Sequence, residues 1–236
     1  MDFATWEPVY EAILADFGYD REGDERARDL LASLVESVDA RPYVPEEDAF
    51  SGETVAIAGA GPSLLEEIDR VRAADTVVAA STAADRLREA GLTPDLVVTD
   101  LDKHPGTVRE LTNEGVSVAV HAHGDNVPLL RQYVPTLELE CVLPTTQAAP
   151  TGSVANYGGF TDGDRAAFLA DHLDADEFVF PGWDFDDQSL GDEKRRKLAW
   201  AERLLYWLED RREERFGILD GRRADVEVDA LGHSRS

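Results

Sequence analysis

The stretch TVAIAGAGPSLLEEIDRVRAADTVVAASTAADRLREAGLTPDLVVTDLD, residues 54–102, decides the fold of this chain. It holds three short apolar runs rich in β-branched residues, each about as long as a strand, with amphipathic stretches between them. The runs lie at 54–59, 76–80 and 95–100, and the stretches between them at 64–74 and 82–91. Strands that are apolar on both faces and alternate with helices are typical of right-handed βαβ units and a parallel sheet.

The same alternation continues toward the C-terminus, with apolar runs at 116–121, 139–143 and 177–182 and an amphipathic stretch at 107–115. We therefore expect an α/β fold, with an open, mostly parallel, Rossmann-like sheet and helices on both of its faces.

Helical patterns flank this region. Apolar side chains at helical spacing predict two helices before residue 48 and one long helix over 192–217. The chain then divides into an N-terminal helical segment at 1–50, an α/β domain at 51–217 and a C-terminal tail at 218–236. Residues 224–236, at the end of the tail, are expected to form an edge strand and a frayed terminus.

The composition is strongly acidic, with 23 Lys+Arg against 49 Asp+Glu among 236 residues and a formal net charge of −26. A chain of this length can bury the core of one large domain. Its charge repels phosphate backbones and anionic bilayers, so nucleic-acid and membrane partners are disfavoured. Only Lys103, Lys194 and Lys197 are lysines. Such a composition is typical of halophilic proteins, because salt at about 1 M screens the repulsion.

The single cysteine, Cys141, excludes a disulfide framework or a four-cysteine zinc site within the chain. Residues 1–13 lack the basic and apolar pattern of a signal peptide, and no apolar run approaches the roughly 20 residues of a membrane span. We therefore expect a cytoplasmic protein. The sequence leaves open whether it forms a homodimer.

Ligands of open parallel sheets bind beyond the carboxyl ends of the strands, so the residues after each apolar run carry the most information. After the first run comes Gly59-Ala60-Gly61-Pro62-Ser63, where backbone N–H groups could approach a phosphate and Ser63 could cap the next helix. The sequence lacks a dinucleotide fingerprint, because Leu64 replaces the third glycine and the second run ends at Ser81 without an acid. The alternative is a tight strand-to-helix turn.

After the third run come Asp100 and Asp102, two residues apart in an extended segment, so their carboxylates are expected to face one spot. Mg²⁺ prefers one or two carboxylates together with phosphate oxygens and water. The pair therefore predicts a metal site, with a chance pair of surface acids as the alternative.

After the fourth run comes His121-Ala122-His123-Gly124-Asp125-Asn126. An HxH pattern could hold zinc, but the other three histidines lack ligand spacing. We favour Asp125 as a third carboxylate on the metal side. The two histidines then form hydrogen bonds or contact phosphate, or are structural.

Three further polar segments follow, at 145–147, 156–165 and 180–185. Polar, glycine-rich loops within a compact domain often bind a ligand. In the last segment a planar heterocycle could stack on aromatic rings while Asp184 accepts hydrogen bonds from its amino and ring N–H groups. The alternative is a satisfied turn beside core aromatic residues.

Six of these motifs, GAGPSL, PDLVVTDLD, HAHGDN, TTQ, NYGGFTDGDR and GWDF, occur in an order that resembles the archaeal 6-hydroxymethyl-7,8-dihydropterin diphosphokinases of the MptE-like family. The resemblance spans about residues 54–208. It implies an enzyme that uses Mg²⁺ and ATP to place a diphosphate on the hydroxymethyl group of a pterin, with release of AMP. Such a reaction belongs to folate or methanopterin biosynthesis.

That family is similar in fold to the catalytic domain of thiamine pyrophosphokinase, whose acidic loops correspond to Asp100, Asp102 and Asp125. This chain differs from the thiamine enzyme in its helical N-terminal segment and lacks room for a C-terminal β-domain, so pterin is favoured over thiamine. The resemblance implies that the three aspartates hold one or two Mg²⁺ ions and that His123 is a proton acceptor.

The resemblance also implies two groups of binding residues. Those for the nucleotide and its phosphates are Gly59, Gly61, Pro62, Ser63 and Ser81. Those for the substrate are Thr146, Gln147, Asn156, Gly158, Gly159, Thr161, Asp162, Asp164 and Asp184, of which Asn156, Asp162 and Asp164 could instead organise a second metal.

Two other functions stay open at this stage. A metal-dependent glycosyltransferase also uses paired acids, but the chain has no length for an acceptor domain. A non-catalytic nucleotide-binding module would keep the glycine motif and leave the acids solvated.

Overall fold

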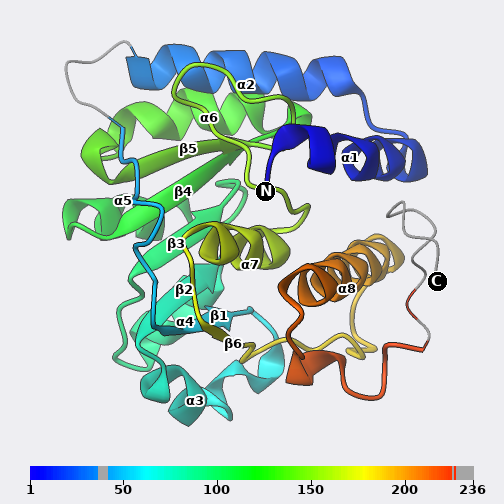
Figure 1. The fold of residues 1–236 in the computed structure, drawn as a ribbon. Helices are drawn as coiled ribbons and strands as arrows, with labels where there is room; N and C mark the ends of the chain where they lie inside the picture. The colour runs from blue at the N-terminus through cyan, green and yellow to red at the C-terminus, as the bar shows by residue number, and fades with distance from the viewer. Residues whose placement is uncertain (37–41, 225, 227–236) are drawn as a thin grey trace.

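The structure of the protein is a computed structural model that describes residues 1–36, 42–224 and 226. Its centre is a six-stranded sheet with strand order β5-β4-β3-β2-β1-β6, and all neighbouring strands are parallel (Figure 1). The strands are β1 Thr54–Ala58, β2 Thr76–Ala80, β3 Leu96–Thr99, β4 Ser117–Ala122, β5 Val142–Thr146 and β6 Glu177–Val179. The predicted α/β fold with an open parallel sheet is confirmed.

Eight α-helices surround this sheet in the described part of the chain. They are α1 Phe3–Phe17, α2 Arg21–Glu36, α3 Ile68–Ala73, α4 Ala83–Glu89, α5 Pro105–Asn113, α6 Val127–Tyr133, α7 Asp162–His172 and α8 Asp192–Arg212. Short 3₁₀ helices lie at Pro62–Leu65, Gly124–Asn126, Val134–Thr136, Leu139–Cys141 and Gly217–Leu219. In the described residues, no helix combines the length and the apolar character needed to cross a membrane.

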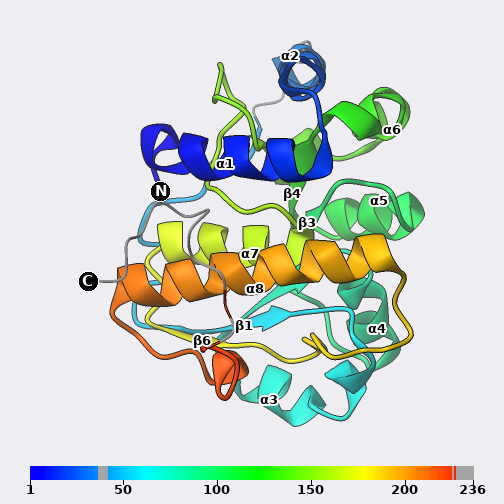
Figure 2. The same cartoon turned by 90° about the vertical axis from the view of Figure 1, so that its right-hand side faces the viewer.

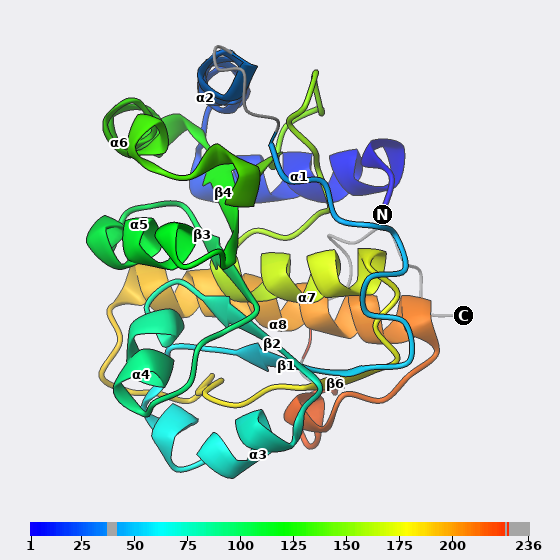
Figure 3. The same cartoon turned by 90° about the vertical axis from the view of Figure 1, so that its left-hand side faces the viewer.

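The helices form two layers, one on each face of the sheet (Figures 2 and 3). Helices α1, α7 and α8 share one hydrophobic core with strand residues such as Val98. Helices α2 to α6 share the other core with strand residues such as Val97. Neighbouring residues of a strand therefore face opposite cores, which explains why the strands are apolar throughout.

The N-terminal helix α1 belongs to the main core. Asp2 caps it by accepting a hydrogen bond from the Thr5 backbone N–H, at 2.8 Å. Its fully buried Trp6 stacks on Trp207 of α8 with ring centroids 6.4 Å apart and also packs against Phe168 of α7. The first and last helices of the chain are thus joined through one aromatic cluster.

The structure differs from the sequence predictions at several element boundaries. The fifth strand begins at Val142, because 139–141 form a 3₁₀ helix, and it contains Pro144, which is tolerated at the edge of a sheet. The last long helix ends at Arg212, where Glu213 takes a left-handed conformation. The edge strand expected within 224–236 lies almost entirely outside the described residues.

The order of strands fixes where a ligand can bind. From β1 to β5 the chain moves steadily toward one edge, and α7 then carries it back to β6 on the far side of β1. The direction reverses at β1, and in open parallel sheets ligands bind at such a switch point, beyond the carboxyl ends of the strands.

Candidate active site

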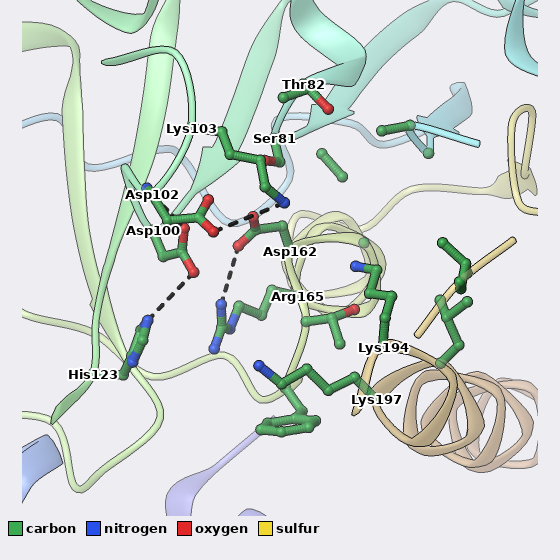
Figure 4. Close-up of a pocket in the computed structure, with 18 of the residues that line it drawn as sticks. Ser81, Thr82, Asp100, Asp102, Lys103, His123, Asp162, Arg165, Lys194 and Lys197 are labelled. Atoms are coloured by element: carbon green, nitrogen blue, oxygen red, sulfur yellow. Dashed lines mark hydrogen bonds and ion pairs between the residues drawn. The ribbon is translucent and has the colours of Figure 1, made fainter. Parts of the chain in front are cut away.

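A cavity of about 650 Å³ lies at the carboxyl ends of the strands. The loops after all six strands line it, and the turn between α1 and α2, residues of α2, the start of α7 and the start of α8 complete it. Figure 4 shows its acidic centre and the basic side chains that surround it.

Residues 99–103, here called the acid turn, bring two carboxyl groups together after β3. Leu101 is fully buried and has a φ of 66°, so the chain turns between the two acids instead of continuing extended. The Asp102 backbone N–H donates to Asp100 Oδ1 at 3.1 Å, and the Leu101 N–H donates to Thr99 Oγ1 at 3.1 Å. The acids do converge, but through a turn and not through the alternation of a strand.

Asp100 is held as an ionised acceptor. Burial alone would raise its pKa, but the hydrogen bond from His123 and the positive charge of Arg165 hold the pKa of Asp100 well below its usual value. His123 Nε2 lies 3.3 Å from Asp100 Oδ2. Half-buried Asp102 behaves in the opposite way, because burial and its hydrogen bond with Asp100 raise its pKa.

Asp162, at the start of α7, adds a third carboxyl group to this centre (Figure 4). Burial and the nearby negative charge of Asp100 raise the pKa of Asp162 to about 7, although Arg165 opposes the shift. Arg165 Nη1 donates to Asp162 Oδ1 at 3.0 Å and its Nη2 donates to Gln147 Oε1 at 3.2 Å. Three carboxyl groups therefore lie close together at this centre, and a bound cation would offset the repulsion between their negative charges.

Asp24 of α2 ties the N-terminal helices to this site. It is buried and accepts three hydrogen bonds of 2.8 Å, from Tyr10 Oη, from Gln147 Nε2 and from the Gly124 backbone N–H. Because Gln147 in turn holds Arg165, the network runs from α1 and α2 to the acidic centre. No sequence pattern marks Asp24 among the 49 acids of the chain.

Residues 59–63, here called the glycine loop, are packed tightly against the segment after β6. The Gly59 N–H donates to Pro181 O and the Gly61 N–H to Gly182 O, both at 2.9 Å. A Cβ atom on Gly61 would lie 2.2 Å from Asp184 Oδ2. The two glycines are therefore required for a close approach of two chain segments.

Ser63 is engaged in the same contact. Its backbone N–H and its Oγ both donate to Asp184 Oδ2, at 3.0 and 2.9 Å. The helix that follows is a 3₁₀ helix of four residues, and Ser63 does not cap it. Three N–H groups of the glycine loop thus already donate within the protein, and a carboxylate lies beside them.

The structure brings most of the predicted site residues to the cavity. Those that line it are Gly59, Gly61, Pro62, Ser81, Asp100, Asp102, His123, Asp125, Gln147, Thr161, Asp162 and Asp184. Six others lie outside its wall, namely Ser63, Thr146, Asn156, Gly158, Gly159 and Asp164.

Four of these six, Asn156, Gly158, Gly159 and Asp164, shape the loop before α7 and the first turn of that helix. Asn156 Nδ2 donates to Ala148 O, and its Oδ1 accepts from the Gly158 N–H, both at 2.8 Å. Asp164 is fully buried and accepts from the backbone N–H and the hydroxyl of Thr161, which fixes the start of α7 at Asp162. Their substrate or metal roles stay predictions.

Several basic cavity residues were missed at the level of sequence. These are Arg26, Arg86, Lys103, Arg165, Lys194 and Lys197. One signal was available, because lysine is rare in this chain and all three lysines line the same cavity.

The donor set fits a hard cation that shares its coordination with a ligand. In the residues that the structure describes, no group of three or more His, Cys, Asp or Glu side chains is placed to hold a metal ion. Asp125 lines the cavity but is exposed, so its predicted place in a three-aspartate set stays a proposal. The close pair Asp100 and Asp102 matches Mg²⁺, which takes one or two carboxylates and completes its shell with phosphate oxygens and water.

Comparison with known proteins relates the chain to enzymes that act on pterins. A sequence-family model described as 6-hydroxymethylpterin diphosphokinase MptE-like matches residues 30–189. The match begins before the first of the motifs, which starts near residue 59.

Curated relatives cover nearly the whole chain. A protein of Methanothermobacter thermautotrophicus is 40% identical over 89% of this chain and 96% of its own length. One of Methanocaldococcus jannaschii is 34% identical over 92% and 99%, and one of Pyrococcus furiosus is 39% identical over 89% and 95%. Each is named 6-hydroxymethyl-7,8-dihydropterin pyrophosphokinase.

Proposed function

The chain belongs to the MptE-like family of 6-hydroxymethylpterin diphosphokinases, and we propose that it transfers the diphosphate of ATP to 6-hydroxymethyl-7,8-dihydropterin. The observation that carries this proposal is the pair Asp100 and Asp102, which stands in the strand-end cavity of a chain 40% identical to a pterin pyrophosphokinase. A carboxylate pair in this place suits the transfer of a metal-bound phosphate group.

The proposed reaction forms one P–O bond, breaks another and releases one proton. The hydroxymethyl oxygen bonds to the β-phosphorus of ATP, and the bond from that phosphorus to the oxygen bridging the α-phosphorus breaks. AMP leaves, the hydroxyl proton is released, and the pterin diphosphate serves pterin cofactor biosynthesis. Charge is spread over the phosphoryl oxygens in the transition state, so positioning and electrostatic stabilisation provide most of the rate.

We assign the metal to Asp100 and Asp102, with Asp125 as a further ligand from the loop after β4. Mg²⁺ held by these residues would supply positive charge that offsets the negative charge of the phosphate groups. The protein's own part is to hold Asp100 ionised and correctly turned. His123 Nε2 does so at 3.3 Å, and Asn126 Nδ2 donates to the Asp100 backbone oxygen at 2.9 Å.

His123 is engaged at both ring nitrogens, since its Nδ1 also accepts from the Asp125 N–H at 3.4 Å. We therefore give it the role of orienting Asp100. Its action as the proton acceptor for the hydroxymethyl group stays a prediction from the family resemblance.

We propose that a heterocycle binds beside the segment after β6. Trp183 and Phe185 line the cavity there, and Trp183 is fixed because its Nε1–H donates to Ile57 O at 2.8 Å. Asp184 uses Oδ2 for Ser63, which leaves Oδ1 as the atom that would accept from a ring N–H. Gln147 and Thr161 also line the cavity, and we propose that they contact the second substrate.

The test is to mix the protein with ATP, Mg²⁺ and 6-hydroxymethyl-7,8-dihydropterin in high salt and to separate the products by chromatography. We expect AMP and pterin diphosphate in a one-to-one ratio. Intact ATP, or ADP in place of AMP, would contradict the proposal. Thiamine in place of the pterin is the matched control and is expected to give no AMP.

A further inference from the structure

All three lysines of the chain line the same cavity, whereas only three of its 20 arginines do so. Lys103 belongs to the acid turn, and Lys194 and Lys197 lie one helical turn apart near the start of α8. Figure 4 shows the side chains of Lys194 and Lys197 extending from α8 toward the acidic centre. The few lysines of this chain are therefore gathered at one site, whereas most of its arginines lie elsewhere.

Two of the three arginines of the cavity are already committed to protein partners. Arg86 Nη1 donates to Gly61 O at 2.7 Å, and both Nη atoms of Arg165 are bonded to Asp162 and Gln147. These two side chains shape the cavity wall. Arg26 is 65% exposed and forms only surface pairs, 3.4 Å from Asp20 and 3.6 Å from Glu22.

The lysines are held more weakly. Lys197 Nζ lies 3.1 Å from Glu193 Oε1, but that glutamate side chain is 73% exposed, and such a surface pair contributes little. Lys103 Nζ lies 3.8 Å from Asp102. Among the described residues, Lys194 has no ion pair within 4.0 Å, and partial desolvation and the charge of Lys103 lower its pKa. The ammonium groups of Lys103 and Lys194 therefore lie near each other, and such a pair favours the binding of an anion.

The ligand that needs such charges is the phosphate chain. ATP is polyanionic, and eight aspartates line the cavity. In high salt the Debye length is only about 3 Å, so only cations in direct contact can offset this repulsion. The glycine loop has few free donors for phosphate, because the N–H groups of Gly59, Gly61 and Ser63 already donate within the protein. The negative charge of the Asp184 carboxylate also lies beside them.

We propose that Lys194 and Lys197 of α8 bind the phosphate chain of the nucleotide, opposite Asp100 and Asp102, and neutralise the diphosphate while it is transferred. This inference rests on the proposed function. Lysine suits the task, because its compact ammonium group can approach phosphate oxygens from several directions, whereas the arginine fork requires one planar geometry. Helix α8 thereby becomes part of the active site.

The experiment compares Lys194→Gln, Lys197→Gln and the double variant with Arg195→Gln. Arg195 is the matched control, because it lies on the same helix, does not line the cavity and pairs with Asp192. Each single lysine variant is expected to raise the KM for ATP or lower kcat so that kcat/KM falls about tenfold, and the double variant about 100-fold. Arg195→Gln is expected to stay within about twofold, and Lys194→Arg to recover part of the loss.

A second measurement uses inorganic triphosphate with Mg²⁺ in calorimetric titrations of the folded proteins. We expect the double variant to bind this probe at least about tenfold more weakly than the wild type and Arg195→Gln. Equal binding and equal kinetics in the double variant and Arg195→Gln would overturn the inference. If the wild type instead makes no pterin diphosphate, the proposed function fails, while the triphosphate titrations still decide the role of the lysines.

Discussion

The glycine loop at 59–63 and the acid turn at 99–103 occupy equivalent places, each directly after a strand of the same sheet. Their polar groups are used very differently. In the glycine loop, backbone N–H groups and the Ser63 hydroxyl donate to Pro181, Gly182 and Asp184. In the acid turn, Asp100 also accepts hydrogen bonds within the protein, from the Asp102 N–H and from His123, but both carboxyl groups line the cavity. A glycine pattern after a strand can thus report close packing of two chain segments, whereas paired acids after a strand remain available to a ligand.

The strongest test of this difference is Asp100→Asn. It removes the charge that His123 and Arg165 stabilise, and we expect kcat to fall about 1,000-fold or more with little change in the thermal unfolding temperature. AMP release under saturating ATP and pterin measures the effect. The control is Asp69→Asn, since Asp69 is 93% exposed on α3. Turnover within tenfold of the wild type would remove Asp100 from the metal site.

The glycine loop should respond in stability. Gly61→Ala places a Cβ atom 2.2 Å from Asp184 Oδ2 and 2.6 Å from Gly182 O, so we expect a loss of about 2 kcal/mol in the free energy of unfolding. Denaturant titration measures it. Gly106→Ala is the matched control, because no atom lies within 4 Å of its added Cβ in α5, and it should be neutral or slightly stabilising. An unchanged stability of Gly61→Ala would show that the two segments are not packed in this way.

Ser63→Ala sharpens the comparison further. The variant loses one hydrogen bond to the Asp184 carboxylate, so the free energy of unfolding should fall by about 1 kcal/mol. If the glycine loop is engaged in packing, the KM for ATP should stay within about twofold of the wild type. A large rise in this KM without loss of stability would favour the phosphate-binding role predicted from the sequence.

The smallest effect is expected away from both regions. Asp16 of α1 accepts from Arg196 Nη2 and from Trp200 Nε1, both at 2.7 Å, and the hydrogen bond from Arg196 lowers its pKa. Because the folded pKa lies below the unfolded value, this stabilisation is present above about pH 4 and is lost as the pH falls further. Asp16 is 36% exposed, so screening keeps the contribution below about 1 kcal/mol.

The measurement compares unfolding of the wild type and Asp16→Asn between pH 6 and 3. We expect the two stabilities to converge as the solution becomes acidic, with the KM for ATP equal in both proteins at neutral pH. A constant difference across this range would mean that the Asp16 carboxylate carries no pH-dependent stability.

Much of the fold followed from periodicity. The six apolar runs became the six strands, and the residues after them became the wall of the cavity, because parallel strands end at one edge. The local sequence pattern could not show that Leu101 lies in a left-handed turn, or that the fifth strand begins after the 3₁₀ helix at 139–141 and not at residue 139. Tertiary packing decides both.

Other parts of the site were out of reach for a different reason. Asp24 and the α8 lysines lie far from the strand-end motifs in sequence, on helices whose patterns report only their buried faces. Only the folded chain shows that Asp24 is hydrogen-bonded to Gln147 and that the Lys194 side chain extends toward the acidic centre.

The placement of the tryptophans has an optical consequence. All four lie in the described part of the chain, and Trp6, Trp200 and Trp207 are at most 2% exposed, whereas Trp183 lines the cavity. Fluorescence from the first three reports the integrity of the core, and fluorescence from Trp183 reports the cavity. If a pterin ring stacks on the Trp183 indole as proposed, it would quench that emission, and ligand binding to the wild-type protein could be followed without any added dye.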